Sequence, residues 1–563
     1  MNEEQVYVNR YDPKTGALLH PEAAQPTAPE APAAAPSTAT VTAQITAPAA
    51  AQTPPKRQRY ASNRQDLVLA VLLAAALALF SDTVCYAGSG LGMSLSLLLA
   101  LCAELWYLWR SGARRSRYAV FLASGALVLV LSPIFSDDAL FRFYCTVGSI
   151  CLMTLLPVEL WQQRRRPAGS FSAASDFFSM LFVRSFGRLG DGVWALTHAE
   201  GAEDRARGRK LGAVLIGLVM AIPVLAIVIP LLMGSDAAFE GLIRGIELGE
   251  LPGHLAAVIF GLCLALLVFS QLFSVRRSSP MEPEREMKPG PVDPIVVVSF
   301  LVILSLTYVL YLISQGAYFF DGFRGLLPAG YSVAEYARRG FFEMSLVCLL
   351  NFALLLLAIR LTRKPDGSTV QGVRLFGLFI CLFSLTLIVI SFSKMFLYID
   401  CFGLTRLRIT TSAFMLLLAC VFAALALRLF VPATPYMKTA VIAATLIAAA
   451  LTLGGVDRIV ASYNVRAYAQ GALDSVDMNT LETLDCGTVP SLIRLLDEPR
   501  YADQARVALR DWTKRLFVVV VHNNDGNRSV ELFAREDADW RSFNTAELQA
   551  KQLIQENLNR IYP

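Results

Sequence analysis

Long apolar segments fill the middle of the chain, from Leu67 to Gly455, and only short polar loops separate them. A helix needs about 20 mainly apolar residues to cross the hydrocarbon core of a bilayer. By that criterion the pattern predicts about eleven transmembrane helices. We place them at 67–86, 91–109, 118–136, 139–161, 211–233, 254–274, 294–314, 340–360, 374–397, 409–431 and 437–456. The expected fold class is therefore all-α, a polytopic helical bundle in a lipid bilayer.

Polar segments divide this apolar region and flank it. Residues 1–66 form an Ala/Pro-rich stretch without periodicity, which is typical of a disordered tail and here of a cytoplasmic one. A cytoplasmic linker at 162–210 separates a four-helix membrane segment, 67–161, from a seven-helix segment, 211–456. Residues 457–563 are polar enough to form a small, mainly helical extracytoplasmic domain.

Two of the polar segments carry a further pattern. Within the linker, Phe178, Phe182 and Leu189 fall near one helical face with Arg184 and Arg188 beside them, which predicts an amphipathic helix at the cytoplasmic membrane surface or a soluble loop helix. The C-terminal domain contains expected helices at 457–470, 478–484, 489–496, 501–512 and 545–561. The last begins with an N-cap signal at Asn544, and 516–521 is the one β-like run before a turn signal at 523–526.

Basic residues in the loops predict the orientation, since Lys and Arg concentrate on the cytoplasmic side of a membrane protein. Basic clusters precede the first span and follow the second, fourth, sixth and eighth. The intervening loops are mostly acidic or uncharged, with exceptions at Arg324, Arg338, Arg339, Arg406 and Arg408. We therefore expect the N-terminus in the cytoplasm and the C-terminal domain outside, which requires an odd number of spans.

Composition supports a membrane protein. The 563 residues are 55% hydrophobic and 17% charged, against about 25% charged in ordinary soluble domains. The net charge of +5 is spread over loops, so we expect no nucleic-acid partner. The ten cysteines show no metal-ligand spacing, and we expect no metal and no cofactor. Cys401 and Cys486 both fall on the expected outer side, where a disulfide between them is one alternative.

Catalytic signatures are missing from the sequence. It has no phosphate-binding loop, no H-E-x-x-H and no nucleophile elbow. The histidines His20, His198, His254 and His522 are scattered. Ser89 and His254 both fall near the expected outer face, but no third partner for a serine-type site is visible. An enzyme is therefore the least supported class of function.

One group of charged residues converges on the expected outer face. Glu335, Arg339 and Glu343 are spaced i, i+4 and i+8, so they share a helix face that leads into the eighth span. Lys394 lies near the outer end of the ninth span, at a depth similar to that of Glu343. Ionisable groups within a membrane are costly and usually paired, so we expect Glu343 to pair with a basic group. The full candidate cluster is Glu335, Arg338, Arg339, Glu343, Lys394, Asp400, Arg406 and Arg408.

A tripeptide recurs at the cytoplasmic ends of two spans. Glu104-Leu105-Trp106 ends the second span and Glu159-Leu160-Trp161 ends the fourth, each before a basic run. The match suggests a duplicated helical hairpin, as in transporters with parallel repeats. Alternatively, it reflects only the preference of Trp for the membrane interface.

Three segments of the second half carry a family resemblance. They are Tyr336-Ala-Arg-Arg-Gly-Phe-Phe-Glu343, Gly403-Leu-Thr-Arg-Leu-Arg408 and Ile459-Val-Ala-Ser-Tyr-Asn-Val465. With them the chain resembles a bacterial polytopic family catalogued as domain of unknown function forty-one seventy-three. The resemblance implies a multi-pass protein of the bacterial cytoplasmic membrane, and it implies no activity, ligand or catalytic residue.

Two functions remain open at this point. In the first, the chain is a non-enzymatic envelope protein that senses, scaffolds or binds a protein partner through its outer face. In the second, it transports a small solute, as suggested by Pro223 and Pro230 within the fifth span and by Glu343 with Lys394. A deep water-filled cavity would favour the transporter, and a plugged bundle the scaffold.

Overall fold

The computed structural model describes residues 60–563, apart from 89, 113–115, 136–137, 162–176, 199–216, most of 218–250, 278–289, 324–332, 363, 365–367, 525–526 and 536–538. For 251–252, 315–323, 333–340, 523–524 and 527–529 it describes the backbone alone. The expected tail up to residue 59, the greater part of the expected span at 211–233 and Ser89 thus lie outside the described residues.

Ten helices among the described residues are long and apolar enough to cross a membrane. They are α1 (Arg64–Asp82) with its continuation η1 (Thr83–Ala87), α2 (Leu91–Arg110), α3 (Arg117–Leu131) with η2 (Ser132–Ile134), α4 (Ala139–Leu160), α10 (Leu251–Arg277), α11 (Pro294–Phe323), α12 (Val333–Leu361), α13 (Gln371–Phe402), α14 (Arg406–Phe430) and α15 (Tyr436–Gly454). The only sheet in the described chain has two strands. The prediction of an all-α polytopic membrane bundle is confirmed.

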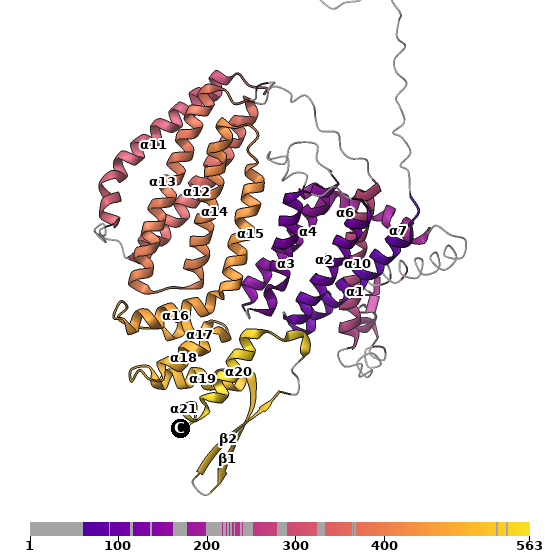
Figure 1. Ribbon diagram of the computed structural model, residues 1–563, viewed down its shortest axis with the longest axis vertical. Coiled ribbons are helices and arrows are strands. Elements are labelled where there is room, and N and C mark those ends of the chain that lie inside the picture. Colours follow the sequence, from indigo (N-terminus) through magenta and orange to yellow (C-terminus); the bar gives the residue numbers. More distant parts are fainter. Residues whose placement is uncertain are drawn as a thin grey trace, which may run out of the picture. The chain divides into compact units, whose positions relative to one another are not determined.

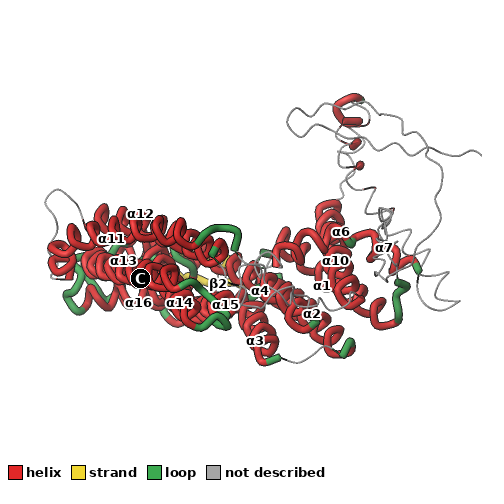
Figure 2. The backbone as a smooth tube through the Cα atoms, turned by 90° about the horizontal axis from the view of Figure 1, so that it is seen from above, coloured by secondary structure: helices red, strands yellow, loops and turns green. Residues whose placement is uncertain are grey.

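The first helices form one packed group (Figures 1 and 2). Helix α1 packs against α2 and α10, and α3 packs against α4. Leu73, Tyr107 and Phe269 are fully buried in the core that α1, α2 and α10 share. Gly261 of α10 lies directly against the backbone of Leu77, so a larger residue there would force α1 and α10 apart.

Helices α11 to α14 form a second group with its own core. A buried chain of hydrogen bonds crosses three of them: the Tyr308 hydroxyl donates to Asn351 at 2.5 Å, and the Asn351 amide donates to Ser384 at 2.9 Å. The Tyr308 ring stacks on Phe383 with the ring centroids 4.0 Å apart. Because every polar atom of this chain has a partner, it fixes α11, α12 and α13 in one register.

Helix α15 joins the two groups, since it packs against α14 on one side and against α3 and α4 on another. Thr445 lies against Gly125 of α3, where a Cβ atom would approach it to 2.7 Å. Further along, the Cys145 sulfur of α4 and the Thr452 hydroxyl share a hydrogen bond of 2.9 Å. Small residues at these crossings allow close approach of the helices.

The expected amphipathic segment is helical where it is described. It consists of η3 (Ser179–Arg184), α6 (Ser185–Gly187) and α7 (Leu189–Thr197). Met180, Gly192 and Ala195 are buried against the spans, whereas Phe182 and Phe186 are more than half exposed. The amphipathic division thus exists, and its location at the cytoplasmic membrane surface stays a prediction.

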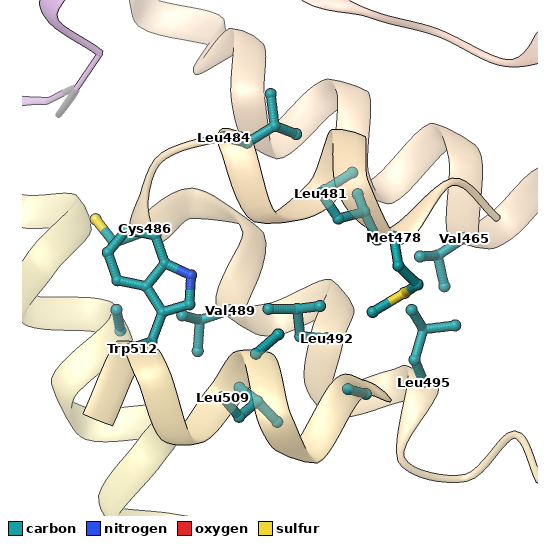
Figure 3. Close-up of a cluster of buried hydrophobic side chains, with 14 of the residues drawn as sticks. Val465, Met478, Leu481, Leu484, Cys486, Val489, Leu492, Leu495, Leu509 and Trp512 are labelled. Atoms are coloured by element: carbon teal, nitrogen blue, oxygen red, sulfur yellow. The ribbon is translucent and has the colours of Figure 1, made fainter. Parts of the chain in front are cut away.

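The C-terminal region folds around one apolar core (Figure 3). Its helices are α16 (Val456–Ala469), α17 (Met478–Thr483), α18 (Val489–Leu495), α19 (Ala502–Leu516), α20 (Thr545–Glu556) and α21 (Leu558–Ile561), with short helical turns η4 (Cys486–Thr488) and η5 (Trp540–Ser542). Leu481, Val489, Leu492 and Leu509 are fully buried and converge in Figure 3 beside Trp512. The core therefore forms where the apolar faces of α16 to α20 meet.

Two local predictions in this region are refined. The β-like run is strand β1 (Phe517–Asn524), and it pairs antiparallel with β2 (Asn527–Ala534) across the predicted turn, which makes a hairpin. The helix expected at 545–561 begins at Thr545 with Asn544 as its cap, because the Asn544 side chain accepts the Glu547 N–H at 2.7 Å. It is interrupted at Asn557, whose side chain turns back to the Leu553 carbonyl.

Candidate functional site

The loop between α13 and α14 is fixed by a residue from the C-terminal region. The side-chain oxygen of Asn464 accepts the Leu404 N–H at 2.6 Å, and its amide nitrogen donates to the Leu404 carbonyl at 2.9 Å. Gly403 has φ +75°, and a Cβ atom there would lie 2.6 Å from the Asn464 oxygen. The segments 403–408 and 459–465, which carry the family resemblance, therefore bind each other.

Arg406 is the centre of a buried ion-pair network, which we call the Arg406 network and which comprises Arg406, Asp138 and Asp457. The Arg406 guanidinium binds both carboxylate oxygens of Asp457, with an Nε to Oδ1 distance of 2.6 Å, and its Nε lies 2.8 Å from Asp138. The two carboxylates are 2–3% exposed. Asp457 also accepts the Asp485 N–H at 2.7 Å. The network thus joins α4, α14 and α16.

The elements explain why these side chains meet. Asp138 caps α4, since it accepts the N–H groups of Leu140 and Phe141 at 2.7 and 3.1 Å. Thr405 caps α14 by accepting the Arg408 N–H, which sets Arg406 at the first residue of that helix. Asp457 lies in the first turn of α16. Two carboxylates at helix N-termini are favoured by the helix dipoles, and one guanidinium offsets their burial.

Arg408 stabilises the same loop by binding backbone carbonyls rather than carboxylates. Its guanidinium donates to the carbonyls of Phe402, at 2.9 Å, and Gly403. It lies over the Tyr398 ring, 3.8 Å from the ring centroid, and the residue is 9% exposed. These contacts satisfy the carbonyls at the C-terminal end of α13, where a cation is favoured. Both arginines are thus bound to groups of this loop and its neighbours, and the pairing of either with Glu343 stays a prediction.

A second junction, which the sequence did not reveal, comprises Asp82, His254, Asp539 and Arg541, and we call it the Asp82 network. Asp82 at the end of α1 contacts His254 Nδ1 at 2.5 Å and accepts a hydrogen bond from Arg541. Arg541 also donates from Nε to Asp539 at 2.6 Å and holds the pKa of that carboxyl below its usual range. The one sequence signal was an acid near the end of an apolar segment.

Further hydrogen bonds and a close backbone approach reinforce this second junction. The Leu91 N–H donates to the Phe543 carbonyl at 2.9 Å, and the Thr545 hydroxyl donates to the Ile134 carbonyl at 3.1 Å. A Cβ atom on Gly90 would lie 2.5 Å from the Ser542 oxygen. The chain around η5 therefore lies tightly against the N-terminus of α2.

The other predicted site residues lie apart from both networks. Lys394 of α13 is half-buried and within electrostatic range of Glu343 of α12, which is exposed. Asp400 is exposed near the end of α13. Glu335, Arg338 and Arg339 lie within α12, but their side chains are outside the described part of the structure. The pairing of Glu343 with Lys394 stays a prediction.

The alternative of a disulfide between Cys401 and Cys486 is wrong. All ten cysteines lie in the described chain and carry thiols. Cys401 is exposed, whereas Cys486 is buried in the core beside Trp512 (Figure 3). Among the described residues there is no group of three or more His, Cys, Asp or Glu side chains that could hold a metal ion. The arrangement that the structure does build is a set of buried polar contacts that fasten the C-terminal domain to the ends of the spans.

Comparisons with known proteins identify the family of the chain but no activity or ligand. No curated protein and no solved structure matches the chain. The expected resemblance to a polytopic membrane family of unknown function is confirmed, and the family that matches carries the number 4153 where the motifs suggested 4173. The match includes the two bound segments at 403–408 and 459–465. With residues 123–495 matched, the chain belongs to the family described as Domain of unknown function (DUF4153).

Proposed function

We propose that this membrane protein is a non-enzymatic scaffold that holds its C-terminal domain at the outer face of a bacterial cytoplasmic membrane and binds a protein partner there. In this proposal the N-terminus is cytoplasmic, and the β1–β2 hairpin contacts the partner. The lipid bilayer surrounds the spans, and no cofactor or nucleic acid takes part.

The buried carboxylates of the Arg406 network and the neighbouring Arg408 support a scaffold because these charged groups are bound within the chain. Asp138, Asp457 and Arg408 are at most 9% exposed, and each is bound by partners within the chain. A solute-binding or catalytic site would need some of these groups to face a cavity. Their burial favours a role in holding the domain in place.

The observation that carries the proposal is the hairpin. It extends from the helices of the C-terminal region as a two-stranded ribbon (Figure 1), and no further strand of the described chain pairs with either edge. Val518 and Phe533 are opposite each other in the register and are each about half exposed. An isolated hairpin is only marginally stable, and an open edge with apolar side chains is a template for an added strand. We infer an extended segment of a partner protein as its ligand.

Site-specific photocrosslinking tests this proposal. A photoreactive amino acid at Val518 in the full chain, in living cells, should give one adduct of constant size. The matched control is Val507, which is also exposed but lies on α19. The adduct should disappear when Phe533→Asp is added, while the melting temperature of the purified variant stays unchanged. An adduct that is identical from Val507, or that survives Phe533→Asp, would overturn the proposal, as would the absence of any adduct.

Small-solute transport is the second candidate, and the buried Tyr308–Asn351–Ser384 chain favours it, because polar groups inside spans often line a pathway. Labelling separates the two candidates. A Ser384→Cys variant that gains reaction with a membrane-impermeant maleimide would place water at this depth and support transport. A variant that reacts no more than the unaltered chain supports the scaffold, since the chain is then plugged by its own side chains.

A further inference from the structure

The repeated Glu-Leu-Trp tripeptide places two glutamates in the same sequence context but in different surroundings. Glu104 lies six residues before the end of α2, and Glu159 is the second-last residue of α4. Each is followed by Leu and Trp and then by basic residues. A difference between them therefore arises from tertiary packing and not from the local sequence.

Glu159 is an ordinary paired carboxylate. Lys438 Nζ lies 3.3 Å from its Oε1, and the Ser116 hydroxyl donates to the same oxygen at 3.2 Å. Lys438 also lies over the Tyr118 ring, 4.4 Å from the centroid. Its carboxyl group therefore has both a cation and a hydroxyl as partners.

Glu104 has neither kind of partner. The residue is 4% exposed, and no side chain in the described part of the chain ion-pairs or hydrogen-bonds with its carboxyl group. The residues one turn away on both sides, Ala100, Leu101, Tyr107 and Leu108, are each at most 2% exposed. They belong to two apolar cores, one formed with α1 and α10 and the other with α3 and α4. Glu104 thus lies between two apolar clusters.

The charged groups on the helices packed against α2 are engaged elsewhere or lie at helix ends. On α1, Asp66 accepts from Tyr107 at 2.6 Å and pairs with Arg276 and Arg277 of α10 at 3.1 and 3.2 Å. Asp82, at the other end of α1, belongs to the second junction. The remaining charged residues of these helices are Arg64 on α1, Arg117 on α3, and Arg142 and Glu159 on α4, all within the first or last turns. None supplies Glu104 with a counter-charge.

From this geometry we propose that Glu104 is a proton-binding site inside the membrane-spanning bundle, which holds its proton at neutral pH. An ionised carboxylate without a partner in an apolar surrounding costs several kcal/mol, whereas the protonated acid is neutral. Ionisable groups kept at such positions mark proton or ion sites in membrane proteins. The ligand is the proton itself, and the inference is independent of the hairpin proposal.

A hydrophobic carbodiimide tests the proposal, because it reacts with protonated carboxyl groups in apolar surroundings. The acid transfers its proton to a carbodiimide nitrogen, and a carboxyl oxygen bonds to the central carbon to give an O-acylisourea. Migration of the acyl group to nitrogen then gives a stable N-acylurea, with no leaving group. Dicyclohexylcarbodiimide, added to the full chain in proteoliposomes at pH 7, should modify Glu104 as detected by peptide mass spectrometry.

Glu159 provides the internal control, since it shares the tripeptide but is ion-paired. We expect at least about tenfold more adduct on Glu104 than on Glu159, a free-energy preference of about 1.4 kcal/mol. The adduct on Glu104 should decrease as the pH is raised, and Glu104→Gln should leave no adduct at that position. Equal modification of both glutamates, or none at Glu104, would overturn the proposal.

The stability of Glu104→Gln gives a second readout that does not depend on reagent access. Glutamine is a neutral isostere of the protonated acid, and unlike Glu104 it takes up no proton when the chain folds at pH 7. The variant should therefore melt at a temperature no lower than that of the unaltered chain. A Glu159→Gln variant, which breaks an ion pair, should melt lower. A fall for Glu104→Gln as large as that for Glu159→Gln would show that Glu104 is ionised and paired, and would contradict the proposal.

Discussion

Asn464 pairs with the backbone of Leu404 as a neighbouring strand would, accepting its N–H at 2.6 Å and donating to its carbonyl at 2.9 Å. One side chain from α16 thereby satisfies both polar groups of a loop residue between two spans. Because α16 is the first helix of the C-terminal region, this pair attaches the region to the loop between α13 and α14.

Replacing Asn464 by Ala should destabilise the protein by about 2 kcal/mol, because the N–H and carbonyl of Leu404 lose their partners. Thermal unfolding of the purified protein in detergent measures the change. Ser462→Ala on the same helix is the control, since the Ser462 hydroxyl contacts only the Ile459 carbonyl of its own helix. Equal effects of the two substitutions would mean that the pair with Leu404 contributes nothing.

Gly403→Ala should be more damaging than Gly471→Ala, although both glycines have positive φ, +75° and +73°. A Cβ atom on Gly403 meets the Asn464 oxygen, whereas nothing lies within 4 Å of one on Gly471. We expect roughly 1–3 kcal/mol for the strained backbone in either case, with the steric clash added only at Gly403. Adding Asn464→Ala should remove that extra cost, so a double-mutant cycle that shows no coupling would contradict the geometry.

Arg406→Ala should cost roughly 3–5 kcal/mol, since it leaves the buried carboxylates of Asp138 and Asp457 without their cation. Adding Asp138→Asn should recover part of the loss because one uncompensated charge is then removed. Arg458→Ala, at an exposed position of the same junction, should change stability by less than about 0.5 kcal/mol. If the double variant is less stable than Arg406→Ala, Asp138 is not part of the ion pair.

The junction around Asp82 should weaken in acid. The hydrogen bond from Arg541 lowers the pKa of Asp539 in the folded protein relative to the unfolded chain. A lowered pKa stabilises the fold at pH values above the ordinary value for Asp, and this contribution is lost as the pH falls through the lowered value. The gap in melting temperature between the unaltered chain and Asp539→Asn should therefore shrink between about pH 5 and pH 2.

Asp503 is the control for this pH dependence, since it also pairs with an arginine, Arg506, but its side chain is 96% exposed. Asp503→Asn should show no comparable gap at any pH. A gap for Asp539→Asn that stays constant down to pH 2 would show that the contact with Arg541 does not depend on the carboxylate charge.

Thiol labelling should distinguish two cysteines that sequence alone could not separate. In intact cells, a membrane-impermeant maleimide should react with the exposed Cys401, as shown by loss of the signal in Cys401→Ser, and not with the buried Cys486. Cys486 should react only after denaturation. Labelling of Cys401 that requires disrupted cells would place this end of α13 in the cytoplasm and reverse the predicted orientation.

The spans and helix caps followed from the sequence because they depend on local patterns. Apolar length alone is enough to find α11 and α13, and the cap at Asn544 depends on a residue three positions away. The ion partners of Arg406 depend on tertiary packing: Asp457 is 51 residues away, and Asp138 belongs to another helical group. The sequence therefore pointed to Arg406 as a candidate, whereas it could not choose among several acids for its partners.

The hairpin likewise combines a part that local sequence predicts with a part that depends on tertiary packing. Its turn signal and first strand were predictable from local sequence, but β2 contains Arg528 and Glu531 and has no continuous apolar run. Its strand character comes from pairing with β1, as in Val521 opposite Val530. Strand propensity depends strongly on such cross-strand neighbours, so one sequence window could not reveal it.

The connection between α15 and α16 has a mechanical consequence. Gly455, with φ +63°, is the single residue between the end of the last span at Gly454 and the start of α16 at Val456. So short a connection, held further by Asn464 and Arg406, prevents the C-terminal domain from turning independently of α15. Because the Asp82 network also fastens this domain to the ends of α1 and α2, the domain cannot follow α15 alone, and any change in the tilt of the domain must be matched by both helical groups.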